Sequence, residues 1–178
     1  MDNAKIKGWT YHVYPGDISS AELGPFQSLV DLWRAKSGEN ALPTWRDFEF
    51  EEFSLWWGRL SLANVLDNPF DIKFPLWGTI LTDWWGVDYT NKKMETVYQG
   101  RKENWEKFEG PYIRALIENQ GVGIVRGDLR VVGRSFLTVQ GVDLPLLKDG
   151  RLTQILSGYC AIERTDIFSP SVSPLWKR

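Results

Sequence analysis

The sequence is poor in the residues that most often carry catalysis or hold a metal. Among 178 residues it has a single cysteine, Cys160, and a single histidine, His12. One cysteine excludes an internal disulfide, and the pair cannot supply the Cys/His sets of the common closed zinc sites. A Ser-His or Cys-His hydrolase would need His12 as its base. We therefore predict no metal site and no catalytic residue, and we interpret Cys160 as a small buried hydrophobic residue.

Low net charge and the lack of long hydrophobic runs exclude two classes of partner. The formal net charge is −2, and the basic residues are scattered. No strong field therefore draws the protein to nucleic acid or to an anionic membrane surface. No apolar run approaches the roughly 20 residues of a membrane span, and the N-terminal residues lack the apolar core of a signal peptide. We expect a cytoplasmic protein with neither nucleic-acid nor membrane partners.

Aromatic residues, by contrast, are abundant, with 10 tryptophans, 9 phenylalanines and 6 tyrosines. Each ring buries roughly 150–250 Å², so aromatic side chains should dominate the core. The densest group lies in FPLWGTILTDWWGVDYTNK, residues 74–92, which holds Trp77, Trp84 and Trp85. These rings can fill a core, line a pocket for a small molecule or contact another protein. The sequence leaves all three alternatives open.

Two helical patterns stand out. Four apolar residues recur at i, i+3, i+4 and i+7 and predict a helix that begins near Pro25; they are Phe26, Leu29, Val30 and Trp33. The longer pattern covers residues 103–120, and Gly110-Pro111 should break or kink it.

Strand patterns occupy the rest of the domain. Residues 59–66 and 71–77 predict a hairpin, and Pro75 places its second strand at a sheet edge. Three β-rich runs follow residue 120, with a hairpin signal at Asp149-Gly150. The order favours an α+β fold. We expect an N-terminal arm over 1–22, one domain over 23–165 and a Ser/Pro-rich tail over 166–178.

The succession of LWRAKSGENALPTWRDFEFEEF, RLSLANVLDNPFDIKFPLWGTILTDWWGVDYTNK and VDLPLLKDGRLTQILSGY resembles a bacterial branch of PAS domains that often occur as stand-alone proteins. Its marks are Trp77-Gly78-Thr79, Gly86-Val87-Asp88, Leu144-Pro145-Leu146 and the Asp149-Gly150 turn. The similarity covers roughly residues 26–162. It implies a PAS-like five-stranded antiparallel sheet in spatial order 2-1-5-4-3, with helices packed on one face.

The resemblance also implies a function. PAS-like domains are sensory modules that bind a small, partly apolar ligand between the sheet and the helices after the second strand. Trp84, Trp85 and Tyr98 fall in that segment, and Arg134 is a candidate polar anchor from the sheet. The sequence does not identify a cofactor. Two alternatives stay open: a ligand-free dimerisation or adaptor module, and a small α+β enzyme for a hydrophobic substrate.

The expected partners are a separate signalling protein and a second copy of the chain. The stripe of Phe26, Leu29, Val30 and Trp33 is the candidate dimer interface, because N-terminal flanks often have this role in the family. Its other interpretation is packing on the chain's own sheet. Trp77 has the opposite parity from the row Ile72, Phe74 and Leu76, which favours an outward-facing contact residue.

Overall fold

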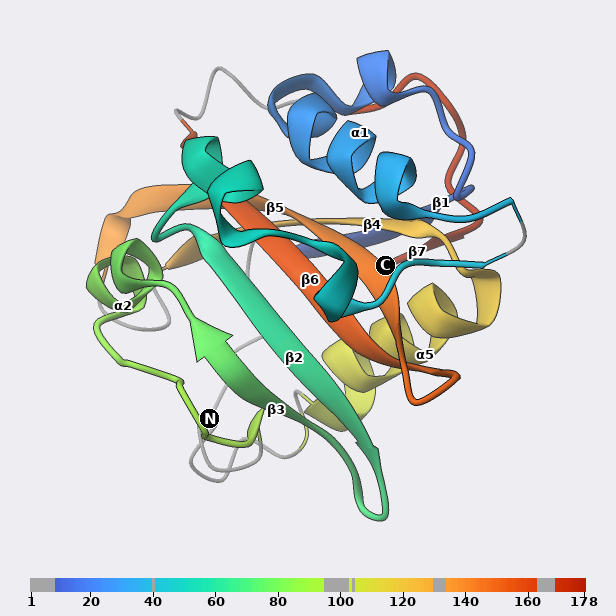
Figure 1. Cartoon of the computed structure of the whole chain (residues 1–178). Helices are drawn as coiled ribbons and strands as arrows, with labels where there is room; N and C mark the ends of the chain where they lie inside the picture. The colour runs from blue at the N-terminus through green and yellow to red at the C-terminus, as the bar shows by residue number, and fades with distance from the viewer. Residues whose placement is uncertain (1–8, 40, 95–102, 104, 130–133, 163–168) are drawn as a thin grey trace.

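A computed structural model describes residues 9–39, 41–94, 103, 105–129, 134–162 and 169–178. Its centre is a seven-stranded sheet in the order β3-β2-β6-β5-β4-β1-β7 (Figure 1), and all neighbouring strands run antiparallel. In chain order the strands are β1 (Thr10–Tyr14), β2 (Leu60–Asp67), β3 (Phe70–Trp77), β4 (Val122–Leu129), β5 (Arg134–Lys148), β6 (Arg151–Ile162) and β7 (Trp176–Lys177).

Helical segments connect the strands. The described α-helices are α1 (Gln27–Lys36), α2 (Thr79–Trp85) and α5 (Gly110–Asn119). Short 3₁₀ segments are η1 (Ser20–Phe26), η2 (Trp45–Asp47) and η3 (Phe50–Trp56), and η4 (Trp105–Glu109) is a π-helical turn. Within the described residues, none of the helices has the length and apolar character needed to cross a membrane.

The expected five-stranded PAS-like sheet is wrong, because β1 and β7 add two strands beyond β4. β1 comes from the expected arm and pairs along its length with β4, while Trp176 and Lys177 of the expected tail pair with β1. The arm joins the sheet because Tyr11 and Val13 are buried on one face and Tyr14 on the other. An added strand also covers the unpaired backbone groups that β4 would otherwise expose.

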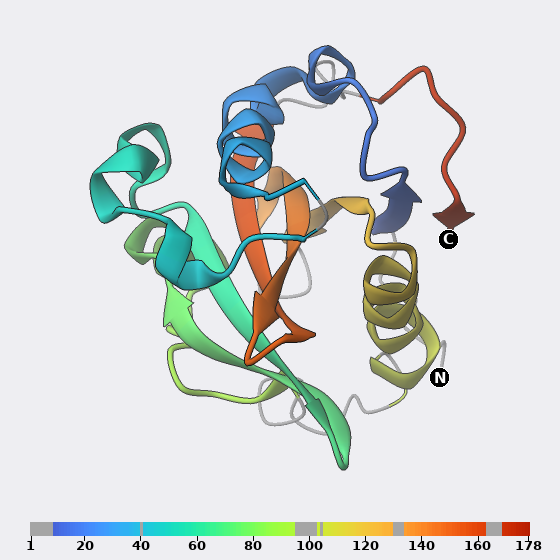
Figure 2. The same ribbon diagram turned by 45° about the vertical axis from the view of Figure 1, so that its right-hand side comes forward.

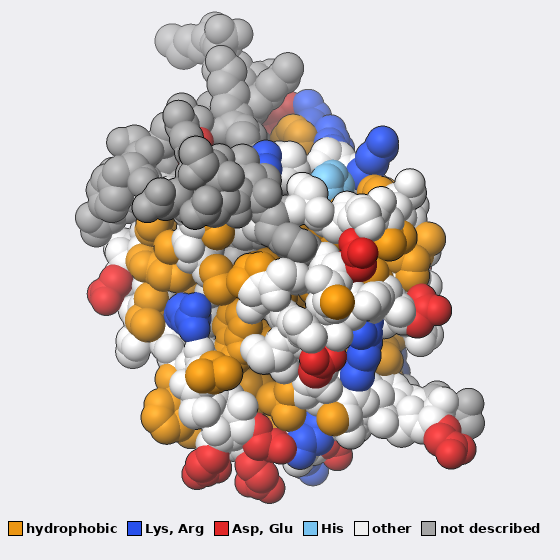
Figure 3. Space-filling model, turned by 90° about the horizontal axis from the view of Figure 1, so that it is seen from above, with side chains coloured by type: hydrophobic (Ala, Val, Ile, Leu, Met, Phe, Trp, Pro, Cys, Tyr) orange, Lys and Arg blue, Asp and Glu red, His pale blue; other side chains and the backbone are white. Residues whose placement is uncertain are grey.

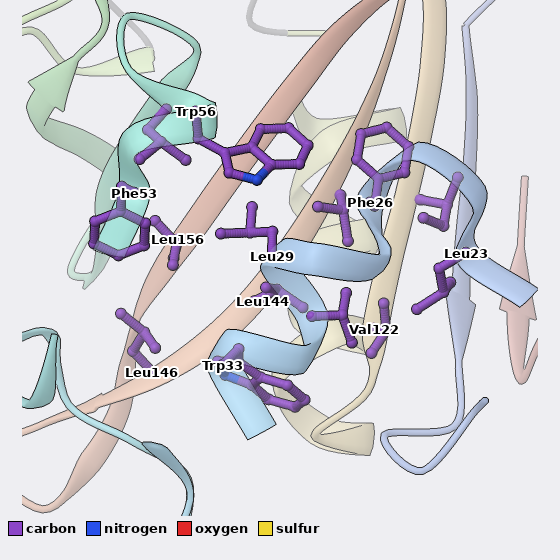
Figure 4. Close-up of a cluster of buried hydrophobic side chains, with 14 of the residues drawn as sticks. Leu23, Phe26, Leu29, Trp33, Phe53, Trp56, Val122, Leu144, Leu146 and Leu156 are labelled. Carbon is purple, nitrogen blue, oxygen red and sulfur yellow. The ribbon is translucent and has the colours of Figure 1, made fainter. Parts of the chain in front are cut away.

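The helices pack on both faces of the sheet, so the prediction that they cover one face is also wrong (Figures 1 and 2). Alternate residues of each strand point to opposite faces. Leu62 and Leu156 face a core built from η1, α1 and η3, which Figure 4 shows in close-up. Their neighbours Ala63 and Ile155 face a second core formed with α2 and α5.

A β-bulge in β3 determines where Trp77 points. Leu62 of β2 pairs with Leu76, but Asn64 pairs with Lys73, so β3 carries one extra residue between these two pairs. The extra residue reverses the alternation. Trp77 therefore lies in the same buried cluster as Ile72 and Phe74, with 8 % of its surface exposed. The prediction that Trp77 faces away from this row is wrong for that reason.

Three predictions from short sequence signals are confirmed: an edge strand, a hairpin turn and a break in a helix. Pro75 lies in β3, which is an edge strand. Asp149 and Gly150 both have positive φ, 52° and 75°, and join β5 to β6 in a tight hairpin. The helical pattern predicted over residues 103–120 changes at Gly110 from the π-helical turn η4 to α5, as the Gly-Pro pair predicts.

Candidate functional site

A group of buried polar side chains lies between α5 and the sheet. Asp143 of β5 is 5 % exposed, although it sits in an otherwise apolar strand run. The Tyr112 hydroxyl on α5 donates a hydrogen bond of 2.7 Å to Asp143 Oδ2. Burial raises the pKa of Asp143, while hydrogen bonds from Ser157 and Tyr112 partly oppose that shift. The carboxyl group is thus held by neutral hydroxyls in a site of low polarity.

A second carboxyl group, that of Glu109, belongs to the same cluster. It lies at the junction of η4 and α5, and the Tyr11 hydroxyl of β1 donates to its Oε1 at 3.2 Å. Burial raises the pKa of Glu109 to about 8; the bond from Tyr11 opposes this, and the charge of Asp143 adds to it. The residue keeps some exposed surface, but its carboxyl group lies deep enough to favour the protonated form near neutral pH.

Two glycines give the tyrosines room to reach the sheet. Gly123 of β4 pairs with Asp143, and a Cβ atom at Gly123 would lie 2.0 Å from the Tyr112 hydroxyl. A Cβ at Gly141 would lie 2.6 Å from the ring of Tyr159. Both distances are too short for any side chain. These glycines are therefore sites where a tyrosine side chain approaches the strand backbone closely.

Beside the polar cluster lies an aromatic cluster, which we define as Phe74, Trp77, Trp85 and Tyr89. Trp77 is at its centre, with ring centroids 4.6 Å from Tyr89, 5.1 Å from Phe74 and 5.5 Å from Trp85. The contacts to Phe74 and Trp85 are edge-to-face, an arrangement that aromatic rings favour. Gly86, with φ 73°, ends α2 directly after Trp85 and turns the chain toward Tyr89.

The indole nitrogen of Trp77 is a buried donor without a hydrogen-bond partner among the described residues. A buried donor that is left unsatisfied costs about 1–3 kcal/mol. Native proteins rarely keep such groups unless a water, an ion or a ligand satisfies them. Trp77 Nε1 is therefore the feature of this cluster that points most directly to a missing acceptor.

Tyr159 of β6 connects the two clusters. Its ring packs edge-to-face on Trp85 with centroids 5.4 Å apart. Burial raises the pKa of Tyr159 well above its ordinary value, and the charges of Asp143 and Glu109 add to that effect. One face of the sheet therefore carries a continuous region with an aromatic end and a hydrogen-bonding, acidic end.

The structure brings together only part of the predicted ligand-binding set. Trp85 contacts Trp77 and Tyr159, and Trp84 is a half-buried neighbour of the same core. Tyr98 lies outside the described residues. Arg134 is the first residue of β5, nine positions before Asp143, which places it roughly 30 Å away along an extended strand.

The residues predicted for a dimer interface lie in the chain's own core. Phe26, Leu29 and Val30 are 0 % exposed, and Trp33 is 2 % exposed. The indole nitrogen of Trp33 also donates to the Pro145 carbonyl at 3.0 Å. The stripe packs on the sheet of the same chain (Figure 4), which leaves no apolar face of α1 for a second copy.

The lone histidine and cysteine lie apart from the polar cluster. His12 in β1 is near the Tyr14 hydroxyl, and burial lowers its pKa. Arg59 donates to Cys160 Sγ at 3.6 Å, and burial raises the pKa of the half-buried thiol. Across the described ranges, the His, Cys, Asp and Glu side chains form no group of three or more suited to hold a metal.

Comparison with known proteins gives no match to a family model, a curated protein or a solved structure. The resemblance to PAS domains therefore stays a hypothesis. The residues of the polar cluster were not predicted from the sequence. Two signals for them exist: a charged residue, Asp143, within an apolar strand run, and Glu109 directly before the Gly-Pro break.

Proposed function

We propose that the protein is a non-enzymatic sensory module that binds a small, flat, largely apolar molecule at the aromatic cluster. The single observation behind the binding proposal is the buried Trp77 Nε1, which has no acceptor among the described residues. A ligand carbonyl or ring nitrogen would accept this hydrogen bond while its apolar body packs against neighbouring rings. The sensory role rests on the resemblance to PAS domains.

The surroundings favour a neutral ligand. Asp143 and Glu109 lie at the other end of the region, next to Tyr159, and their buried carboxyl groups offer an anion no positive charge to bind. Trp84 and Trp85 are half-buried, so the cluster has an edge toward solvent through which a small molecule can approach. A neutral molecule with one acceptor matches both features.

Native mass spectrometry of freshly purified protein tests the proposal. We expect a copurified small molecule on the wild-type protein and its loss from Trp77→Phe, which keeps an aromatic ring but removes the donor. Trp57→Phe is the matched control because the Trp57 indole is half-exposed and lies outside the cluster. Equal retention by both variants, or a wild-type protein that neither carries nor takes up benzamide or quinoline, would refute the assignment.

A further inference from the structure

Three exposed hydrophobic residues lie in η3 and directly after it. We call the residues Phe50, Leu55 and Trp57 the η3 patch; they are 59 %, 70 % and 50 % exposed. The inward residues of the same segment, Phe53 and Trp56, point into the core (Figure 4), so the patch is fixed to the sheet from below. Figure 2 shows this segment, in teal, at the periphery of the molecule.

The η3 patch is held in one arrangement. The rings of Phe50 and Trp57 stack with centroids 5.6 Å apart and planes 10° from parallel. Trp57 Nε1 also donates to the Phe50 carbonyl at 3.2 Å. At the start of the segment, Glu49 and Glu52 form a reciprocal capping box. A rigid patch loses little conformational entropy when a partner binds, which is typical of the residues that dominate interfaces.

Acidic side chains lie on the N-terminal side of the patch, while Arg59, which donates to the Leu55 carbonyl, lies at its other end. Asp47, Glu49, Glu51 and Glu52 are all exposed, against one basic residue, Arg46, in the same stretch. Lys36 pairs with Glu52 at 2.7 Å, whereas Glu49 and Glu51 form no ion pair with any described residue. Figure 3, a view from above, shows acidic side chains beside hydrophobic ones at its lower margin, with Lys and Arg side chains next to them.

We propose that the η3 patch docks a segment of another protein that carries aromatic or aliphatic anchors flanked by Lys or Arg. Apolar anchors would cover Phe50, Leu55 and Trp57, and the basic flanks would complement Glu49 and Glu51. A charge pattern of this kind disfavours a second copy of the chain, because two identical acidic rims would repel each other.

The core side of η3, through Trp56, contacts the strand that joins the two clusters. A Cβ at Gly158 would lie 3.1 Å from the Trp56 ring, and Gly158 is flanked in β6 by Ser157 and Tyr159. The inference thus deepens the proposed function by naming the chemistry of its protein partner, and the reporting role rests on that function. Docking itself does not require a small ligand, so the two proposals can fail separately.

Peptide selection on the immobilised full chain tests the docking proposal. A random phage-displayed 16-residue library is selected on wild-type protein, with removal of phage that bind the double variant Leu55→Ser/Trp57→Ser. We expect enriched peptides with net positive charge and Trp, Phe or Leu anchors. A synthetic enriched peptide should bind the double variant, and Leu55→Ser alone, at least about tenfold more weakly than wild type.

Charge reversal and a distant control complete the test. Glu51→Lys, which leaves the capping box intact, should weaken binding of the same peptide about threefold at low salt, and less at high salt. Leu175→Ser removes a comparably exposed apolar residue elsewhere and should leave affinity unchanged. Enriched peptides without positive charge, or with equal affinity for the double variant, would overturn the proposal. Sedimentation showing a dimer that Leu55→Ser dissociates would also overturn it, in favour of a second copy.

Discussion

Replacing Glu109 by glutamine should remove much of the pH dependence of stability between pH 4.5 and 8. In the unfolded chain this carboxyl has a pKa near 4.5, and in the folded protein burial raises the pKa to about 8. Below pH 4.5 both states hold the proton and the full stability is present. As the pH rises toward 8, the unfolded chain releases the proton while the folded protein keeps it, so the free energy of unfolding falls.

The size of the effect follows from the two pKa values. A rise from 4.5 to about 8 corresponds to a loss of up to about 5 kcal/mol across this range. Urea unfolding at pH 5, 6, 7 and 8 measures it, and we expect a loss of about 2–5 kcal/mol in wild type that Glu109→Gln lacks. Glu118→Gln, at an exposed position of α5, serves as the control. Parallel stability curves for wild type and Glu109→Gln would show that Glu109 is already ionised in the folded protein.

Three further predictions concern the polar cluster and the lone thiol. Tyr112→Phe should destabilise the fold by about 1–3 kcal/mol in chemical unfolding, because Asp143 loses a buried donor; no change would mean that the bond contributes nothing. Gly123→Ala should destabilise by at least about 1–3 kcal/mol, since its Cβ would meet the Tyr112 hydroxyl, and Tyr112→Phe should recover part of that loss in the double variant. Cys160 should react with a disulfide reagent at pH 7.5 more slowly than free cysteine, because burial raises its pKa; an equal rate would count against this description of the thiol.

Local sequence signals predicted the elements that depend on local chemistry. The period of Phe26, Leu29 and Trp33 predicted α1, and Pro75 predicted an edge strand. The Asp149-Gly150 pair predicted the hairpin, because an αL conformation at both positions is what a tight two-residue turn requires. Each of these features is encoded within a few consecutive residues.

Features that depend on pairing between distant segments were not predictable in the same way. β1 joins the sheet through β4, more than 100 residues later, and its short sequence has no distinctive strand period. The β-bulge in β3, opposite Ala63, depends on how β2 and β3 pair. It places Trp77 on the same face of the sheet as Ile72 and Phe74, which simple alternation along the sequence had excluded. Asp143 and Tyr112 likewise meet only when α5 packs on the sheet. The expected ligand set missed the polar cluster for this reason.

The most direct test of the account is the indole resonance of Trp77 in a ¹H–¹⁵N NMR spectrum, assigned by its loss in Trp77→Phe. The account predicts that quinoline or benzamide shifts this resonance and that of Trp85 along saturable curves, while the resonance of half-exposed Trp57 stays in place. If the Trp77 resonance does not move with any neutral acceptor, or if all indole resonances shift alike, the aromatic cluster is a filled core and the ligand-binding proposal is wrong.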